Sequence, residues 1–83
     1  MNIAKVKHLA EIAKFFEFES TNVVVTLEQE KLLLVTSLAH LDDIIGRIVE
    51  SDYVKSINIA IADEVDQSDR ILAHIRVTVS DEE

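Results

Sequence analysis

The three histidines have the widest chemical range in this sequence, because an unperturbed imidazole titrates near neutral pH and ligates metals. His8, His40 and His74 are far apart in the chain, and none forms the His-x-x-x-His or Glu-x-x-His pair that binds zinc on a helix. His40 and Asp43 have the i,i+3 spacing that could bring both side chains to one metal ion. A capping or surface pair satisfies the same spacing, and we favour it. We expect no metal site.

Nucleophilic catalysis needs a serine or cysteine beside a base, and the sequence carries no such signature. The serines are scattered, none lies in a Gly-x-Ser-x-Gly elbow, and there is no cysteine. Asp42 and Asp43 are adjacent, so on a helix they diverge by about 100° and do not share a proton. The single glycine excludes a glycine-rich phosphate loop. We expect a non-enzymatic protein without catalytic residues or cofactors.

The densest group of oxygen ligands is the acidic segment 63–69, Asp-Glu-Val-Asp-Gln-Ser-Asp. Its four carboxylates could bind Ca²⁺, which takes six to eight oxygens, but the glycine and closing glutamate of an EF-hand are missing. We interpret the segment as a solvated hairpin loop.

The net charge of −8 is unevenly distributed along the chain. Residues 1–41 hold five acids and four bases (−1), whereas residues 42–83 hold eleven acids and four bases (−7). An acidic surface repels phosphates, so we expect no direct nucleic-acid binding. It could instead bind a basic protein, as an acidic, phage-type inhibitor or nucleic-acid mimic that blocks the basic groove of a nuclease or polymerase. The carboxylates assigned to this surface are Asp42, Asp43, Glu50, Asp52, Asp63, Glu64, Asp66 and Asp69.

Length and composition predict a single domain over residues 1–83, with residues 81–83 as a frayed acidic tail. Apolar residues make up 48% of the chain, which is enough for a core. No run of 18 apolar residues exists, and Lys5, Lys7 and Glu11 interrupt the apolar residues near the N-terminus. We therefore expect neither a membrane-spanning segment nor a secretory signal. Without cysteine the default location is the cytoplasm, or the periplasm if the chain is an excised domain.

The elements that position these residues are clearest at the C-terminus. Residues 56–80 alternate apolar and polar side chains on both sides of the acidic segment, which predicts a β-hairpin with one buried face. On that face we place Ile57, Ile59 and Ile61 from the first strand and alternate residues from Ile71 to Val79 from the second.

The N-terminal half begins with a predicted helix over 2–16, whose apolar residues recur at three- and four-residue spacing and leave His8 on the polar arc. The β-branched run 23–27 predicts a strand. Residues 28–36 are ambiguous. Lys31 to Thr36 can form a second strand, or Thr26 and Gln29 can cap a long helix that continues to Ile48.

A second helix is predicted from Ser37 or His40 to Ser51, with Asp42 and Asp43 favoured in its first turn. Gly46 inside this helix costs up to about 1 kcal/mol relative to alanine. We expect a close contact between helix and sheet to compensate.

These elements predict an α+β two-layer sandwich of order αββαββ, with an antiparallel sheet covered on one face by two helices. The two halves, about 2–38 and 39–80, repeat one pattern, and the arrangement is ferredoxin-like or permuted. The alternative is αβαββ with one long central helix. In the order and lengths of its elements the chain resembles the small periplasmic modules of type II secretion and type IV pilus assembly proteins. The resemblance implies an excised assembly module, although the transmembrane anchor of those proteins is absent from this sequence.

Apolar residues exceed what one sheet face can bury. Residues 32–35 are Leu-Leu-Leu-Val, so two of them point away from the helices whichever way the strand is turned. Exposed apolar patches usually mark interaction sites. We therefore expect an interaction or assembly module that docks through its outer sheet face or an edge strand, most simply as a homodimer. The residues assigned to this interface are Leu32, Leu34, Ala60, Ala62, Leu72 and His74.

Overall fold

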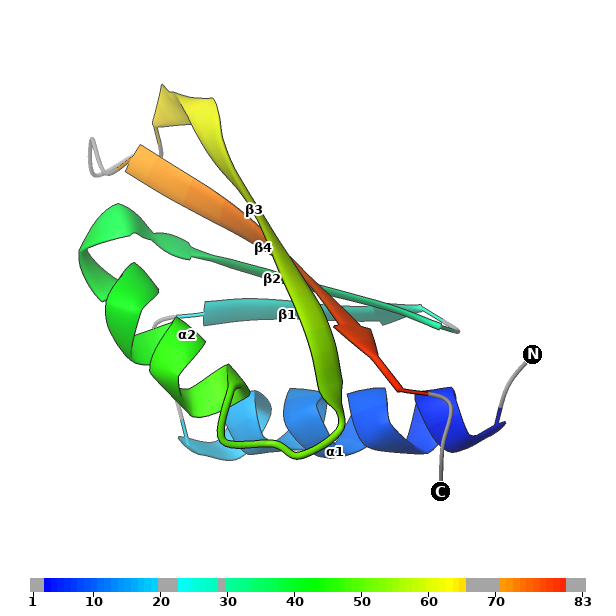
Figure 1. Cartoon of the computed structure of the whole chain (residues 1–83). Helices are drawn as coiled ribbons and strands as arrows, with labels where there is room; N and C mark the ends of the chain where they lie inside the picture. Colours follow the sequence, from blue (N-terminus) through cyan, green and yellow to red (C-terminus); the bar gives the residue numbers. More distant parts are fainter. Residues whose placement is uncertain (1–2, 20–22, 29, 66–70, 81–83) are drawn as a thin grey trace.

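The computed structural model describes residues 3–19, 23–28, 30–65 and 71–80 (Figure 1). Its elements are α1 (Ile3–Glu19), β1 (Val23–Glu28), β2 (Lys31–Ser37), the 3-10 turn η1 (Leu38–His40), α2 (Leu41–Ile48), β3 (Val54–Val65) and β4 (Ile71–Val79). This order confirms the predicted αββαββ layout.

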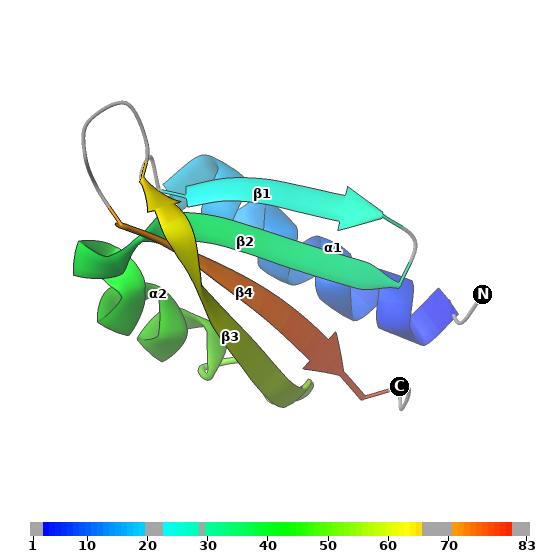
Figure 2. The same cartoon turned by 90° about the horizontal axis from the view of Figure 1, so that it is seen from above.

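The four strands form one antiparallel sheet in the order β1-β2-β4-β3. Both helices lie on the same face of this sheet, as Figures 1 and 2 show. The inner strands β2 and β4 come from different halves of the chain, and each half contributes one helix and one edge strand. The two-layer α+β sandwich is therefore confirmed, and the alternative with one long central helix is wrong. The reason is that residues 31–36 pair with β1 in an unbroken register from Glu28↔Lys31 to Val23↔Thr36.

The core lies between the helices and the sheet, and it draws on both halves. Its buried residues are Leu9, Ile12, Ala13, Phe16, Leu32, Leu34, Ile44, Ile48, Ile75, Val77 and Val79. Burial of this apolar surface holds the two layers together.

Helix α1 is buried over a wider arc than its sequence pattern predicts. His8, expected on the polar arc, is 8% exposed and stacks on Tyr53 with a centroid distance of 3.7 Å. The expectation of an exposed His8 is therefore wrong, because Tyr53, which follows α2 in the chain and is distant in sequence, covers its ring. The sequence pattern of α1 alone cannot predict such a contact.

The orientation of β2 corrects part of the predicted interface. Leu32 and Leu34 are 0% exposed and belong to the core. They therefore cannot lie on the outer face of the sheet. Because side chains alternate along a strand, the half-buried Leu33 and Val35 take that position instead.

Helix α2 is shorter than predicted, because Leu38–His40 form a 3-10 turn and the helix ends at Ile48. The expected close contact at Gly46 is wrong. Gly46 is exposed, and a Cβ at this position would meet no atom within 4 Å.

We therefore expect Gly46→Ala to stabilise the protein by up to about 1 kcal/mol, because alanine loses less backbone entropy in a helix and meets no steric obstacle here. In a domain of this size that gain raises Tm by roughly 4–8 °C. Thermal unfolding followed by circular dichroism measures it. A lowered Tm would show that the glycine is required by a contact outside the described residues.

The far end of the β3–β4 hairpin is less buried than its sequence pattern predicts. Ile57 packs against the core, whereas Ile59, Ile61 and Ile71 are exposed, although all three lie on the helix-facing side. The helix layer ends before the strands do (Figure 1). Within the described residues, neither helix is long and apolar enough to cross a membrane.

Candidate interaction surface

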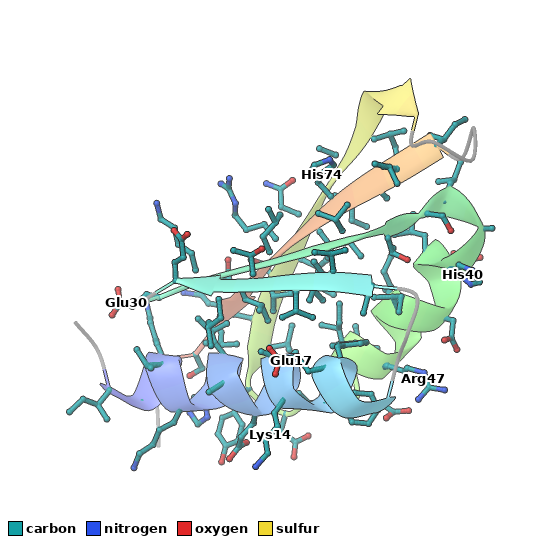
Figure 3. The ribbon with its side chains drawn as sticks, turned by 180° about the vertical axis from the view of Figure 1, so that it is seen from behind. Lys14, Glu17, Glu30, His40, Arg47 and His74 are labelled. Carbon is teal, nitrogen blue, oxygen red and sulfur yellow. The ribbon has the colours of Figure 1, made fainter. Side chains whose placement is uncertain are left out.

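The three histidines do not converge on one site. His8 is buried against Tyr53, His40 lies in η1, and His74 lies on β4, on the side of the sheet away from α1 (Figure 3). The described residues contain no group of three or more His, Asp or Glu side chains that could hold a metal ion. Asp43, considered above as a partner for His40, instead forms an ion pair with Arg47 at 3.2 Å.

The predicted acidic surface is described only in part. Asp42, Asp43, Glu50 and Asp52 are exposed along α2 and the turn that follows it. The side chains of Asp63 and Glu64 lie outside the described residues, as do Asp66, Asp69 and the predicted tail 81–83. The described half of this surface therefore belongs to the helix layer.

The other face of the sheet, which we call the outer face, is covered by none of the described elements (Figures 1 and 3). Period-two alternation and the strand register define its residues. They are Val24, Thr26, Glu28, Lys31, Leu33, Val35, Ser56, Asn58, Ala60, Leu72, His74, Arg76 and Thr78.

Apolar side chains form the middle of the outer face. Val35 lies opposite Val24 on one side and His74 on the other, and His74 in turn lies opposite Ala60. Leu72 lies at the end of the same strand, opposite Ser37. Of the residues assigned to the interface from sequence, Ala60, Leu72 and His74 are thus brought together, whereas the side chain of Ala62 lies outside the described residues.

The outer face is hollowed rather than enclosed. Leu33 and Arg76 lie opposite each other and separate two shallow depressions. One is lined by Leu33, Asn58, Ala60, His74 and Arg76, and the other by Thr26, Glu28, Lys31, Leu33 and Arg76. Such open hollows suit the side chains of a docked protein better than a small molecule, which is usually held in a deep cleft.

The charge of the outer face differs from that of the whole chain. Among the residues whose side chains the structure describes, it carries the bases Lys31 and Arg76 against the single acid Glu28, although the chain as a whole has a net charge of −8. This face is therefore a surface on which another acidic molecule meets little repulsion.

The two edge strands differ in how well they are protected from pairing with another chain. Edge strands expose unpaired backbone groups, and bulges or charges usually block them. β3 has register shifts between Val54 and Ser56 and between Ile61 and Val65. β1 pairs without a shift, and its only charged residue is Glu28 at its end. β1 is the more open edge, and Val24 on it is 66% exposed.

Comparison with protein-family models, curated protein sequences and solved structures gives no significant match.

Sequence reasoning missed Leu33, Val35 and Val24 as members of the interface. Four apolar residues in succession carry no period of two, so the sequence offers no signal for which pair faces outward. Val24 lies in a similar run, Val23-Val24-Val25.

Proposed function

We propose that this chain is a non-enzymatic interaction module that forms a homodimer through the outer face. The observation that carries this proposal is a sheet with one face packed on helices and the other bare, with Leu33 and Val35 in the middle of the bare face and Leu72 at one end of it. A freely solvated sheet face is normally polar at these outward-facing positions. Two copies stacked face to face remove these side chains from water.

Charge supports a second copy as the partner. Two molecules of net charge −8 repel each other, and the repulsion is smallest where each presents the fewest acids. The outer face, with Lys31 and Arg76 against Glu28, meets that condition. A two-fold arrangement uses the same patch on both copies, and closed two-fold dimers are the commonest assemblies.

The strand order supports a second, more specific proposal. The order β1-β2-β4-β3 with both helices on one face is that of a ferredoxin-like βαββαβ sandwich whose first strand has moved to the end of the chain. This is the permuted arrangement expected from the resemblance to periplasmic modules of secretion and pilus assembly proteins. In that case the dimer would act within a larger assembly in the periplasm.

Leu72→Asp is expected to convert the dimer into a monomer, because it buries a carboxylate between two apolar surfaces. Light scattering coupled to size exclusion at micromolar concentration should show the molar mass fall from about twice the chain mass to the 9.4 kDa of one chain. The wild-type dimer should persist at about 0.5 M salt, since apolar docking is not screened.

Val49→Asp is the matched control. Val49 is 57% exposed at the end of α2, so its substitution adds the same charge to the opposite layer of the molecule. It should leave the mass unchanged. A monomeric wild type, or equal dissociation by both variants, would refute the dimer. Capture of a basic nuclease or polymerase that is lost in high salt would instead favour the acidic inhibitor.

A further inference from the structure

A second apolar surface, which the described helices leave uncovered, lies on the opposite side of the sheet from the outer face. Leu38, Ile59, Ile61 and Ile71 are each 40% to 50% exposed. We call this surface the apolar end. Large apolar side chains gathered in one place, unlike single exposed residues, mark a site of interaction.

The strand register places these four residues together. Ile59 and Ile61 lie opposite Ile75 and Ala73, which face the helices, and Ile71 alternates onto the same side as Ala73. Leu38 follows Ser37, the partner of Leu72, and so comes next to Ile71 in the adjoining turn. The surface is thus built from η1, β3 and β4.

The apolar end is uncovered because the helix layer is shorter than the sheet. α2 has eight residues and spans about 12 Å, whereas β3 has twelve residues and spans about 40 Å. Figure 1 shows the ends of β3 and β4 rising beyond α2. In a two-layer sandwich, the element that covers this side of a sheet is a helix. The shape of the gap therefore favours a helix as its occupant.

The charges beside the apolar end select the kind of helix. Asp42 and Asp43 lie in the first turn of α2, directly after η1, and both are exposed. Arg47 pairs with Asp43, but no described residue forms an ion pair with Asp42. A second copy of this chain would bring these acids against its own, so the partner is a different, basic protein.

We propose that the apolar end binds a basic amphipathic helix of another protein, whose apolar stripe covers the isoleucines and whose lysines or arginines meet the acids of α2. This is a helix-in-groove mode of recognition, in which apolar anchors supply affinity and charge supplies specificity. The site is separate from the outer face, so it stands or falls independently of the homodimer.

The test uses the full chain and two synthetic helical peptides of about 18 residues, or five turns. Both carry the same leucine stripe, with lysines on the polar face of one and glutamates on the other. Fluorescence anisotropy at about 50 mM salt should show the lysine peptide binding at least about tenfold more tightly than the glutamate peptide. The double variant Ile59→Thr/Ile61→Thr should lower the affinity for the lysine peptide by about tenfold. Threonine is chosen because it keeps the high strand propensity of isoleucine.

Val49→Thr provides the control for non-specific attraction, because Val49 is somewhat more exposed than Ile59 and Ile61 but lies at the other end of α2. It should leave the affinity unchanged. Asp42→Asn should reduce both the affinity and its dependence on salt. Equal binding of the two peptides, or equal weakening by the control, would overturn the proposal. So would a change in the molar mass of the protein caused by the Ile59/Ile61 variant, since the surface would then join two copies of this chain.

Discussion

Leu34→Ala is expected to lower the free energy of unfolding by about 2–5 kcal/mol, whereas Leu33→Ala should lower it by about 1 kcal/mol or less. Leu34 is 0% exposed, lies opposite Ile75 in the pair of inner strands β2 and β4, and belongs to the core. Truncation there removes buried methyl groups and leaves a cavity between sheet and helices. Leu33 points to the outer face, which is bare in the single chain, so truncation leaves no cavity when stability is measured at a concentration where the protein is monomeric.

The two variants form a matched pair, since they change the same residue type at adjacent positions of one strand. Urea unfolding followed by circular dichroism gives both free energies, with the variants compared at one protein concentration because a dimer couples stability to concentration. For a domain with a total stability of about 5–15 kcal/mol, the loss at Leu34 is a large fraction. Equal losses at Leu33 and Leu34 would mean that the outer face is buried as deeply as the core.

The sequence was most informative where a single period governs a long segment. The alternation in residues 56–80 predicts the hairpin of β3 and β4, and the structure confirms it. The 3.6-residue spacing of α1 likewise predicts the helix, which ends three residues later than expected, at Glu19. Together these patterns favour the αββαββ order, because each half needs a helix to cover its apolar sheet face, but they leave residues 28–36 open between a strand and a long helix.

The sequence was ambiguous where every residue is apolar. Residues 32–35 satisfy a strand in either orientation, and also a buried helix, so periodicity alone cannot place Leu32 and Leu34. The pairing of Leu34 with Val25 and Ile75 decides the matter. Both contacts depend on the assembled sheet, and neither is visible in the local sequence.

His8 and Gly46 also show that the local sequence does not reveal tertiary contacts. His8 is a polar residue that tertiary contact with Tyr53 buries, and Gly46 is a small residue that no tertiary contact requires. In each case the residue type suggested the wrong environment, because burial at that position depends on which element packs against it. The sequence also does not show how long a helix is relative to the strands that it covers. Nothing in the pattern of Ile59 and Ile61 indicates that α2 ends before it reaches them.

The two uncovered apolar surfaces differ in the charges that surround them. The outer face has more bases than acids, whereas the apolar end adjoins Asp42 and Asp43. This difference separates the partners that we propose: an acidic copy of the same chain for the first, and a basic helix for the second. A single molecule could hold both at once, since the surfaces lie on opposite sides of the sheet.

Phe16→Ala is expected to cost about 3–5 kcal/mol, the largest loss among single truncations in α1. Phe16 is 1% exposed and belongs to the core that joins α1 to the sheet. Its ring meets that of Phe15 edge-on, with a centroid distance of 5.3 Å and an interplanar angle of 90°. Removal of the ring therefore takes away apolar burial and one aromatic contact together. Urea unfolding of the full chain measures the loss.

Phe15→Ala is the control for Phe16→Ala, because both truncations remove the same contact between the two rings. The difference between the two losses therefore reports the contribution of burying Phe16. Phe15 is 38% exposed, and the guanidinium carbon of Arg47 lies 5.8 Å from its ring centroid. An exposed cation–π contact contributes about 0.5–1 kcal/mol. The loss at Phe15 should therefore stay several-fold below the loss at Phe16. Since adjacent residues are about 100° apart around a helix, a reversed ranking would mean that α1 presents a different face to the sheet.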